Sequence, residues 1–438
     1  MNRVHFVTLG CSKNEVDSSI MQSVLNKDQF LIEKNPHHAD IIIINTCGFI
    51  QSAKEESIDT IFEASLYKER GQCKKLLLAG CLAQRYSKEL MEEIPEIDGI
   101  IGTGNLKDLN AILMDVLENQ RVVKADNIND DYLEGYERLN VQVTEYVKIS
   151  EGCNNHCSYC IIPQLRGRNR SRKIEDIVDE IQYLVANGAR EIILIGQNTT
   201  DYGIDLYGEY RLADLISEIS RIEKLKWIRV LYLYPDHFND LLIDEFKNND
   251  KLLKYVDIPL QHVSNRVLKG MNRHTDQNHI KNLMHRLRSE IKDIVIRTTF
   301  IVGFPGEEES DFRELMDFIK KYPFDKIGVF PYSREEGTKA YEMKEQVPET
   351  IKTQRIQSIM KMQSSISKEL LEQNIGKVLE ILIEEKVAPN EYIGRSVMDA
   401  PEIDGITYVH SQKDIQTGDF IPVEIMDALE YDLIGDAL

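Results

Sequence analysis

The chain has 438 residues, of which 42% are hydrophobic and 29% are charged, as in a soluble globular protein of two or three domains. Its formal net charge of −20 argues against general affinity for nucleic acid. The longest apolar runs, such as residues 41–44, are too short to cross a bilayer, and residues 1–10 do not resemble a signal peptide, so we expect a cytoplasmic protein without membrane association.

Residues 1–118 predict a parallel α/β sheet domain, because short apolar runs alternate with helical patterns. Cys11, Cys47 and Cys81 each follow one of the predicted strands. The carboxyl ends of parallel strands share one edge of a sheet, where ligands usually bind, so we expect the three cysteines to converge there. The predicted strands are residues 4–10, 39–48, 74–81 and 97–105, and the predicted helices include residues 17–25 and 53–67.

Residues 119–140 are polar and predict a linker or surface excursion. The alternation of strands and helices resumes in residues 141–373. Six strand–helix units in series predict a barrel or partial barrel, whose site lies in the loops at the strand carboxyl ends. The predicted strands are residues 145–150, 190–196, 227–233, 254–260, 294–303 and 325–333, and the predicted helices include residues 173–187 and 311–322.

Residues 374–438 predict a small antiparallel β-barrel, because short strand-like runs are separated by Gly, Pro and Asp. From residue 375 onward this region holds 14 Asp or Glu and 4 Lys or Arg, a net charge of −10. Proteins bind nucleic acid through Lys and Arg contacts to phosphates, so the composition favours a basic protein as the partner. A merely acidic, solvated surface is the alternative interpretation.

Three cysteines with the spacing C-x3-C-x2-C, namely Cys153, Cys157 and Cys160, follow the first predicted strand of residues 141–373. A structural zinc ion needs four ligands; no second cysteine pair is present, and His156 is the one candidate for a fourth ligand. An iron–sulfur cluster fits better, because its ligands are thiolates. Three thiolates would leave one iron of a 4Fe–4S cluster open for a substrate or cofactor.

The C-x3-C-x2-C spacing, with Tyr159 before the third cysteine, resembles the signature of the radical S-adenosylmethionine (SAM) superfamily. The resemblance implies that the open iron binds SAM, which is then cleaved reductively to a 5′-deoxyadenosyl radical. The segments IGQNTTDYG and TTFIVGFPGEEESDF resemble SAM-binding segments of that superfamily. The resemblance thus implies SAM contacts at Gly196, Gln197, Gly303 and Gly306. An ordinary turn between strand and helix also explains the last two glycines.

The segments LGCSKNEVDS, NTCGFI and AGCLAQR resemble, in the same order, the N-terminal domain of radical SAM methylthiotransferases. This resemblance covers essentially the whole chain and implies a transferase with a C-terminal TRAM domain. It also implies a second, auxiliary 4Fe–4S cluster on Cys11, Cys47 and Cys81. Cys73 matches no ligand of the family, and we interpret it as incidental.

Two branches of the family differ in substrate. One branch methylthiolates a modified adenosine of transfer RNA, and the other methylthiolates the β-carbon of an aspartate of ribosomal protein S12. The segment GRSVMDAPEIDGITYV resembles the second branch, which agrees with the acidic C-terminal region. The resemblance implies ribosomal protein S12 or the small ribosomal subunit as partner, and an electron donor such as flavodoxin or ferredoxin. A non-catalytic iron–sulfur protein is an alternative of another class, against which the SAM-like segments argue.

Four arginines follow the second cysteine cluster, at positions 166, 168, 170 and 172. One interpretation is a solvated loop that leads into a helix starting near Ile174. Another is that one or more of them pairs with a carboxylate of SAM or of the substrate aspartate, since a guanidinium fork suits a carboxylate. The sequence leaves both interpretations open.

Overall fold

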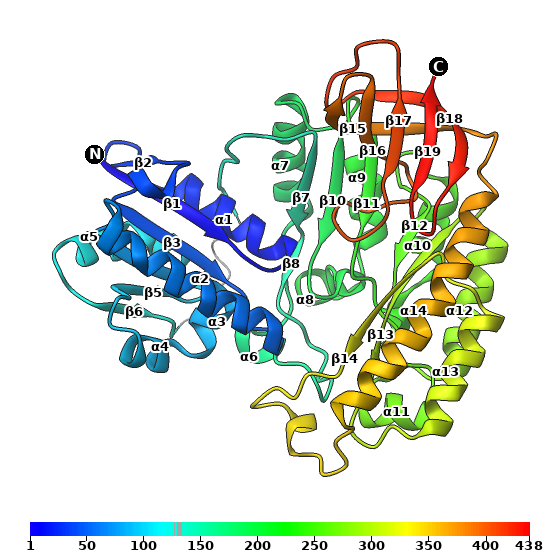
Figure 1. Ribbon diagram of the computed structural model, residues 1–438, viewed down its shortest axis with the longest axis horizontal. Coiled ribbons are helices and arrows are strands. Elements are labelled where there is room, and N and C mark those ends of the chain that lie inside the picture. The colour runs from blue at the N-terminus through cyan, green and yellow to red at the C-terminus, as the bar shows by residue number, and fades with distance from the viewer. Residues whose placement is uncertain (127, 129–133) are drawn as a thin grey trace. The chain divides into compact units, whose positions relative to one another are not determined.

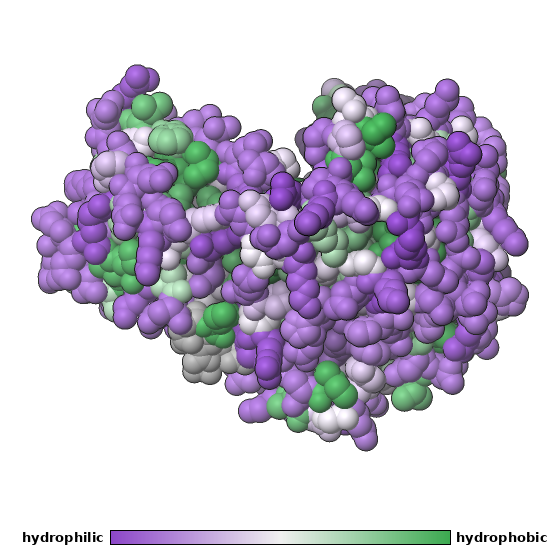
Figure 2. Space-filling view, turned by 90° about the horizontal axis from the view of Figure 1, so that it is seen from below, coloured by the Kyte–Doolittle hydropathy of each residue, from purple (hydrophilic) through white to green (hydrophobic). Residues whose placement is uncertain are grey.

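The computed structural model describes residues 1–126, 128 and 134–438. The chain forms two compact units, one of residues 1–224 with 333–341 and one of residues 225–332 with 342–438. The first boundary falls inside residues 141–373, and the bounds expected for the domains, 1–118, 119–140, 141–373 and 374–438, stay predictions. No described helix is both long and apolar enough to cross a membrane. Hydrophilic residues predominate on the face drawn in Figure 2.

The first unit begins with a six-stranded sheet in the order β2-β1-β3-β4-β5-β6, and all its pairs are parallel, as the sequence predicts (Figure 1). The strand order reverses between β1 and β3, which makes their carboxyl ends a topological switch point. The strands are β1 (Asn2–Thr8), β2 (Phe30–Ile32), β3 (Ile41–Thr46), β4 (Lys75–Ala79), β5 (Gly99–Ile101) and β6 (Val122–Lys124). The helices are α1 (Ser12–Val24), α2 (Gln51–Arg70), α3 (Gly80–Arg85), α4 (Ser87–Glu93) and α5 (Leu109–Leu117), with short 3-10 helices at Pro36–His38 and Leu106–Asp108.

Two of these strands, β2 and β6, are absent from the sequence prediction. Both are three-residue strands at the edges of the sheet, too short to show an apolar period. β6 lies within residues 119–140, so the expected linker begins with a strand that pairs with β5. The middle of that linker, residues 127 and 129–133, lies outside the described residues.

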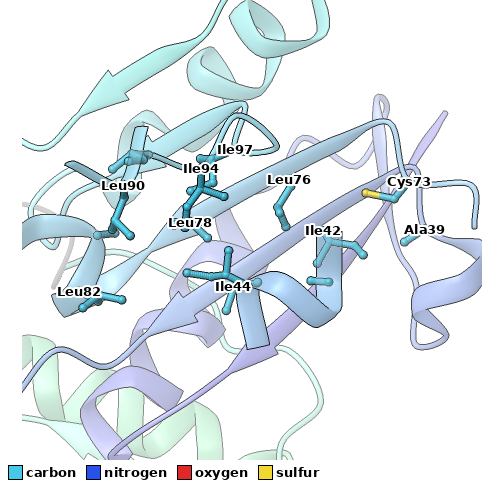
Figure 3. Close-up of a cluster of buried hydrophobic side chains, with 14 residues drawn as sticks. Ala39, Ile42, Ile44, Cys73, Leu76, Leu78, Leu82, Leu90, Ile94 and Ile97 are labelled. Atoms are coloured by element: carbon cyan, nitrogen blue, oxygen red, sulfur yellow. The ribbon is translucent and has the colours of Figure 1, made fainter. Parts of the chain in front are cut away.

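A cluster of buried apolar side chains fixes α3 and α4 against β3 and β4 (Figure 3). Ile44 and Leu78 come from the two strands, and Leu82 and Leu90 come from the two helices. Every residue of β3 is buried, as expected for a parallel strand that is covered on both faces. Cys73 belongs to this cluster, which contains none of the other cysteines, so its side chain is part of the core.

The rest of the first unit carries the second cysteine cluster. β7 (Thr144–Lys148) and β10 (Glu191–Ile195) pair in parallel, and β8 (Ser150–Glu151) pairs antiparallel with β9 (Arg170–Ser171). The cysteines lie between β8 and the next helix, α6. The helices are α6 (Ile162–Arg166), α7 (Ile174–Ala186), α8 (Ile204–Tyr207) and α9 (Leu212–Ser220), with a 3-10 helix at Thr199–Asp201.

The second unit begins with β11 (Trp227–Val230) and a parallel sheet of β12 (Tyr255–Asp257), β13 (Val295–Val302) and β14 (Lys326–Pro331). All six strands predicted in residues 141–373 are therefore present in the structure. The long helix α14 packs against β14. The helices are α10 (Asp240–Asn248), α11 (Asn265–Gly270), α12 (Gln277–Glu290), α13 (Glu309–Lys321) and α14 (Glu349–Glu372), with 3-10 helices at Pro235–His237 and Lys339–Glu342.

The C-terminal residues form the predicted small barrel, which is closed and has the order β15-β16-β17-β19-β18. Four pairs are antiparallel, and β17 pairs with β19 in parallel. The parallel pair was not predicted, but strand directions cannot alternate all the way round a closed ring with an odd number of strands. The strands are β15 (Val378–Ala388), β16 (Glu391–Arg395), β17 (Thr407–His410), β18 (Phe420–Ala428) and β19 (Leu433–Ala437).

Candidate functional site

The three N-terminal cysteines lie at the carboxyl ends of the adjacent strands β1, β3 and β4, at the edge that contains the switch point. Cys11 caps the start of α1, Cys47 directly follows β3, and Cys81 lies in the first turn of α3. A Cβ placed on Gly10 would be 3.0 Å from the Sγ of Cys47, so the chain at Cys11 runs close against Cys47. The parallel sheet thus joins residues that are far apart in sequence.

The thiols of this triplet influence one another. The pKa of the Cys47 thiol is raised to about 11, mainly by burial, and the nearby thiols of Cys81 and Cys11 contribute to the rise. Burial also raises the pKa of the Cys81 thiol, although the Arg166 guanidinium opposes the rise. Cys11 is exposed, whereas Cys47 and Cys81 are buried, and none of them is in a disulfide. Three reduced thiols are therefore available on one edge of the sheet.

The second triplet, Cys153, Cys157 and Cys160, lies on a tight loop held by backbone hydrogen bonds. The backbone N–H of Cys153 donates to the carbonyl of Gly167 at 3.1 Å, and that of Cys160 donates to the carbonyl of Cys157 at 3.1 Å. Gly152 has a φ of +80°, and a Cβ there would lie 2.1 Å from the carbonyl oxygen of Arg168. Only glycine fits at position 152, so the close approach of the two chain segments depends on it.

Both triplets have the donor type that iron–sulfur clusters use, and two cluster sites stay a prediction. Across residues 1–126, 128 and 134–438, no three His, Cys, Asp or Glu side chains converge to hold one metal ion. In a 4Fe–4S cluster each thiolate binds a different iron, so the ligands surround the cluster and do not meet at one point. Each triplet supplies three cysteines that form no disulfide, and thiolates are the ligands that such clusters use.

The four residues expected to contact SAM have different surroundings. Gly196 follows β10, where a Cβ would lie 2.8 Å from the Oγ of Ser150, and Gln197 donates from Nε2 to Glu151 at 2.5 Å. The Oε1 of Gln197 is buried and has no hydrogen-bond partner in the described structure. Gly303 and Gly306 have φ values of +74° and +80°, so the turn after β13 requires both. Their roles as SAM contacts stay predictions.

The arginines after the second cysteine cluster do not form a solvated loop. The side chains of Arg166 and Arg172 are each 2% exposed, whereas Arg168 is exposed. Arg172 pairs with Asp176 and Glu180 of α7, which begins at Ile174 as expected. Arg166 and Arg172 thus pair with carboxylates of this chain, and pairing of any of the four arginines with a carboxylate of SAM or of the substrate stays a prediction.

A buried group of charged side chains, which was not predicted from the sequence, lies beside the first triplet. Lys148 and Arg166 each pair with both Asp17 and Glu151, at distances from 2.5 to 3.1 Å. Asn14 accepts a further hydrogen bond from Arg166 at 2.8 Å. Asp17 is 149 positions from Arg166 in the chain, so no local pattern joins them. The signal available was the polar segment SKNEVD directly after Cys11, whose Lys13, Asn14 and Asp17 are buried.

Three family models match different parts of the chain. The radical SAM superfamily matches residues 147–319, the uncharacterized protein family UPF0004 matches residues 3–102, and the TRAM domain matches residues 375–438. The first match contains Cys153, Cys157 and Cys160, and the second contains Cys11, Cys47 and Cys81. The order of the three matches agrees with the order of the expected regions.

Solved structures share this fold at low sequence identity. The radical SAM methyltransferase TsrM from Kitasatospora setae, with tryptophan and a SAM analogue bound, has a TM-score of 0.57 and 14% identity, over 89% of this chain and 79% of that chain. The cobalamin-dependent SAM radical enzyme OxsB has a TM-score of 0.54 and 14% identity, over 82% of this chain and 56% of that chain. These likenesses concern the fold alone.

Curated relatives are similar over the full length. Proteins from Clostridioides difficile and Desulforamulus reducens are 47% and 49% identical, each over 100% of this chain and 99% of the relative. A protein from Thermoanaerobacter sp. is 48% identical over 100% of both chains. All three are named ribosomal protein uS12 methylthiotransferase RimO. Identity at this level over 99–100% of each chain, together with the two cysteine triplets and the closed C-terminal barrel, shows that the chain belongs to the RimO family of radical SAM methylthiotransferases.

Proposed function

We propose that this chain is a transferase that adds a methylthio group to the β-carbon of an aspartate of ribosomal protein S12. The observation that carries the proposal is the full-length identity of 47–49% to proteins named for that activity. The substrate is a ribosomal protein, so we propose that the reaction takes place in the cytoplasm, on S12 or on the small ribosomal subunit. A reductant such as flavodoxin or ferredoxin would supply the electrons.

Two 4Fe–4S clusters are part of the proposal. Cys153, Cys157 and Cys160 would hold the cluster that binds SAM, and Cys11, Cys47 and Cys81 would hold the auxiliary cluster. When bound, the first would supply the electron for SAM cleavage, and the second would hold the sulfur that is methylated. Burial raises the pKa of the Cys47 and Cys153 thiols to about 11, so iron binding must displace their protons.

The outer surface of the C-terminal barrel supports a basic protein as the substrate. Glu391 of β16, Glu424 of β18 and Asp436 of β19 are exposed, and in the strand registers Glu424 and Asp436 are direct partners. His410 of β17 stands between Glu391 and Asp436 in the same row. Tyr408 and Met426 add apolar surface, at 40% and 53% exposure. Such a surface would repel the phosphates of an RNA and attract a basic polypeptide.

Mass spectrometry of ribosomal protein S12 and of transfer RNA tests the proposal directly. In cells that lack this protein, S12 should lose its methylthio group, while the modified nucleosides of transfer RNA should not change. Re-expression of the wild-type chain should restore the methylthio group of S12, whereas expression of the Cys157→Ala variant should not. Loss of a methylthiolated adenosine with intact S12 would overturn the choice of substrate.

A further inference from the structure

Arg166 connects the two cysteine triplets. It follows Cys160 by six residues and ends α6, so by sequence it belongs to the loop of the second triplet. Its guanidinium nevertheless lies against the N-terminal sheet domain, where one terminal nitrogen is 3.4 Å from the Sγ of Cys81. The same nitrogen donates to the Oδ1 of Asn14 at 2.8 Å. A ligand candidate of the first triplet thus receives a hydrogen bond from the segment of the second.

The guanidinium is fixed by charge on its other side. Asp17 and Glu151 accept from the second terminal nitrogen of Arg166 at 2.9 and 3.1 Å, and Lys148 pairs with the same two carboxylates. Each of these four side chains is at most 2% exposed. The described ion pairs join two cations to two carboxylates without a contribution from a thiolate. The hydrogen bond from Arg166 to Cys81 is made in addition to these ion pairs.

Apolar packing holds the backbone of α6 in the same place. Cys81, Ile161 and Leu165 form a buried cluster of their own. The hydroxyl of Thr103, which follows β5 at the same carboxyl edge of the sheet, donates to the carbonyl of Leu165 at 2.7 Å. Both contacts hold α6 beside Cys81, so the position of the guanidinium does not depend on one flexible side chain.

We propose that Arg166 is a positioning residue for the auxiliary cluster, where it donates a hydrogen bond to the Cys81 thiolate and raises the reduction potential of that cluster. Hydrogen bonds to the sulfurs are among the factors that set the potential of an iron–sulfur cluster. A hydrogen bond to the thiolate sulfur withdraws electron density from the sulfur and so favours the reduced cluster. Arginine suits this role because it stays protonated and has five donors in a fixed fork. This inference rests on the proposed function, because it assumes the auxiliary cluster.

The test uses the full-length chain with Cys153, Cys157 and Cys160 replaced by Ala, so that only the auxiliary cluster forms. This parent should hold about four irons after anaerobic reconstitution. In this background we compare Arg166→Lys with the matched control Arg168→Lys, which changes an exposed side chain. The measurements are iron content, thermal unfolding and a potentiometric titration followed by electron paramagnetic resonance.

We expect Arg166→Lys to retain its iron and to shift the midpoint potential to a lower value, because a lysine has no fork to span Asn14, Asp17 and Cys81 together. Arg168→Lys should keep the potential of the parent. A potential that is unchanged in Arg166→Lys, with full iron, would overturn the inference and leave Arg166 as an ion-pair residue only. A parent that binds no iron would overturn the proposed auxiliary cluster, and the inference with it.

If Arg166→Lys does not fold, a second measurement, made on the parent, tests the inference about Arg166. In a parent whose arginine is labelled with ¹⁵N, the reduced cluster should show a ¹⁵N hyperfine coupling in place of the ¹⁴N coupling of the unlabelled protein. The absence of any such coupling would overturn the inference, because the hydrogen bond places a guanidinium nitrogen next to a cluster ligand.

Discussion

The seven cysteines have three different environments, and each environment predicts a different result of substitution. Cys11, Cys47 and Cys81 share the edge of the first sheet, and Cys153, Cys157 and Cys160 share one loop. Cys73 is 5% exposed in an apolar cluster, where its thiol donates to the carbonyl of Lys75 at 3.3 Å. The first two environments suit metal ligands, and the third suits a core residue.

Iron content should separate the two triplets. The reconstituted wild-type chain should hold about eight irons, and Cys157→Ala and Cys47→Ala should each remove about half of them. Cys157→Ala should also abolish SAM cleavage, whereas Cys47→Ala should keep SAM cleavage and lose methylthio transfer. Cys73→Ser is the control: it should keep all iron and lose only about 1 kcal/mol of stability for a polar atom in the core. Loss of one cluster in Cys73→Ser would show that a ligand was wrongly assigned.

His262 should make stability depend on pH. Burial lowers its pKa to about 3, with Arg355 and Arg266 adding to the effect and Asp311 opposing it. Its Nδ1 accepts from the backbone N–H of Ser264 at 2.9 Å, so the folded state holds the neutral ring. The pKa of an unfolded histidine is about 6.5. The stabilisation is therefore complete above that pH and is lost as the pH falls toward 3.

Urea unfolding at pH 7, 6, 5 and 4 measures this effect. The free energy of unfolding should fall by about 1 kcal/mol more per pH unit below pH 6 in the wild-type chain than in His262→Gln. The exposed His410 provides the matched control, and His410→Gln should follow the wild-type pH dependence. Equal slopes for wild type and His262→Gln would contradict the assignment.

At the scale of elements, the loop between β16 and β17 contains two acidic side chains that stabilise the fold, unlike the acidic side chains of this region that face solvent. Asp399 pairs with Lys326 of β14 at 2.6 Å, and both side chains are less than 10% exposed. Asp404 accepts from the hydroxyl of Tyr255 at 2.6 Å and pairs with Arg297 at 3.4 Å. The net charge of residues 375–438 includes Asp399 and Asp404 as if they were surface charges. In the structure, these two side chains connect the barrel to the strands β12, β13 and β14.

Asp399→Asn should therefore destabilise the second unit and not only change its charge. It leaves the ammonium of Lys326 buried without its counter-ion, which costs about 3 kcal/mol. Asp414 pairs with Lys386 on the surface at 2.6 Å, where solvent screens the charges, so Asp414→Asn should change stability far less. Differential scanning calorimetry of the two variants compares a buried and an exposed pair with the same chemistry. Similar melting temperatures for the two would contradict the distinction.

The elements show what a sequence can predict and what it cannot. Continuous apolar runs such as residues 41–44 predict strands correctly, because burial on both faces leaves a local pattern. The three-residue strands β2 and β6 leave none. The partners of Arg166 could not be predicted from the sequence either, because Asp17 and Cys81 come close to Arg166 only in the folded sheet domain. The convergence of the first triplet could be predicted, because parallel strands share a carboxyl edge.

For the molecule as a whole, charge should govern recognition of the substrate. Glu391, Glu424 and Asp436 are exposed on the outer face of the barrel, and their replacement by Gln, Gln and Asn should slow the methylthiolation of ribosomal protein S12. The loss should be largest at low salt, because salt screens exposed charges. SAM cleavage without substrate is the internal control and should persist, since both triplets lie in other parts of the chain. Faster modification of transfer RNA by this variant would favour the other branch.

The five-stranded ring also has a consequence for biosynthesis. β19 (Leu433–Ala437) fills the gap between β17 and β18, so both of these strands keep an open edge until residues 433–437 have emerged from the ribosome. Open edges of this kind template intermolecular pairing. A shortened transcript without the codons from Leu433 onward would therefore release a chain that aggregates or is degraded, even though the cysteines of both triplets were translated long before.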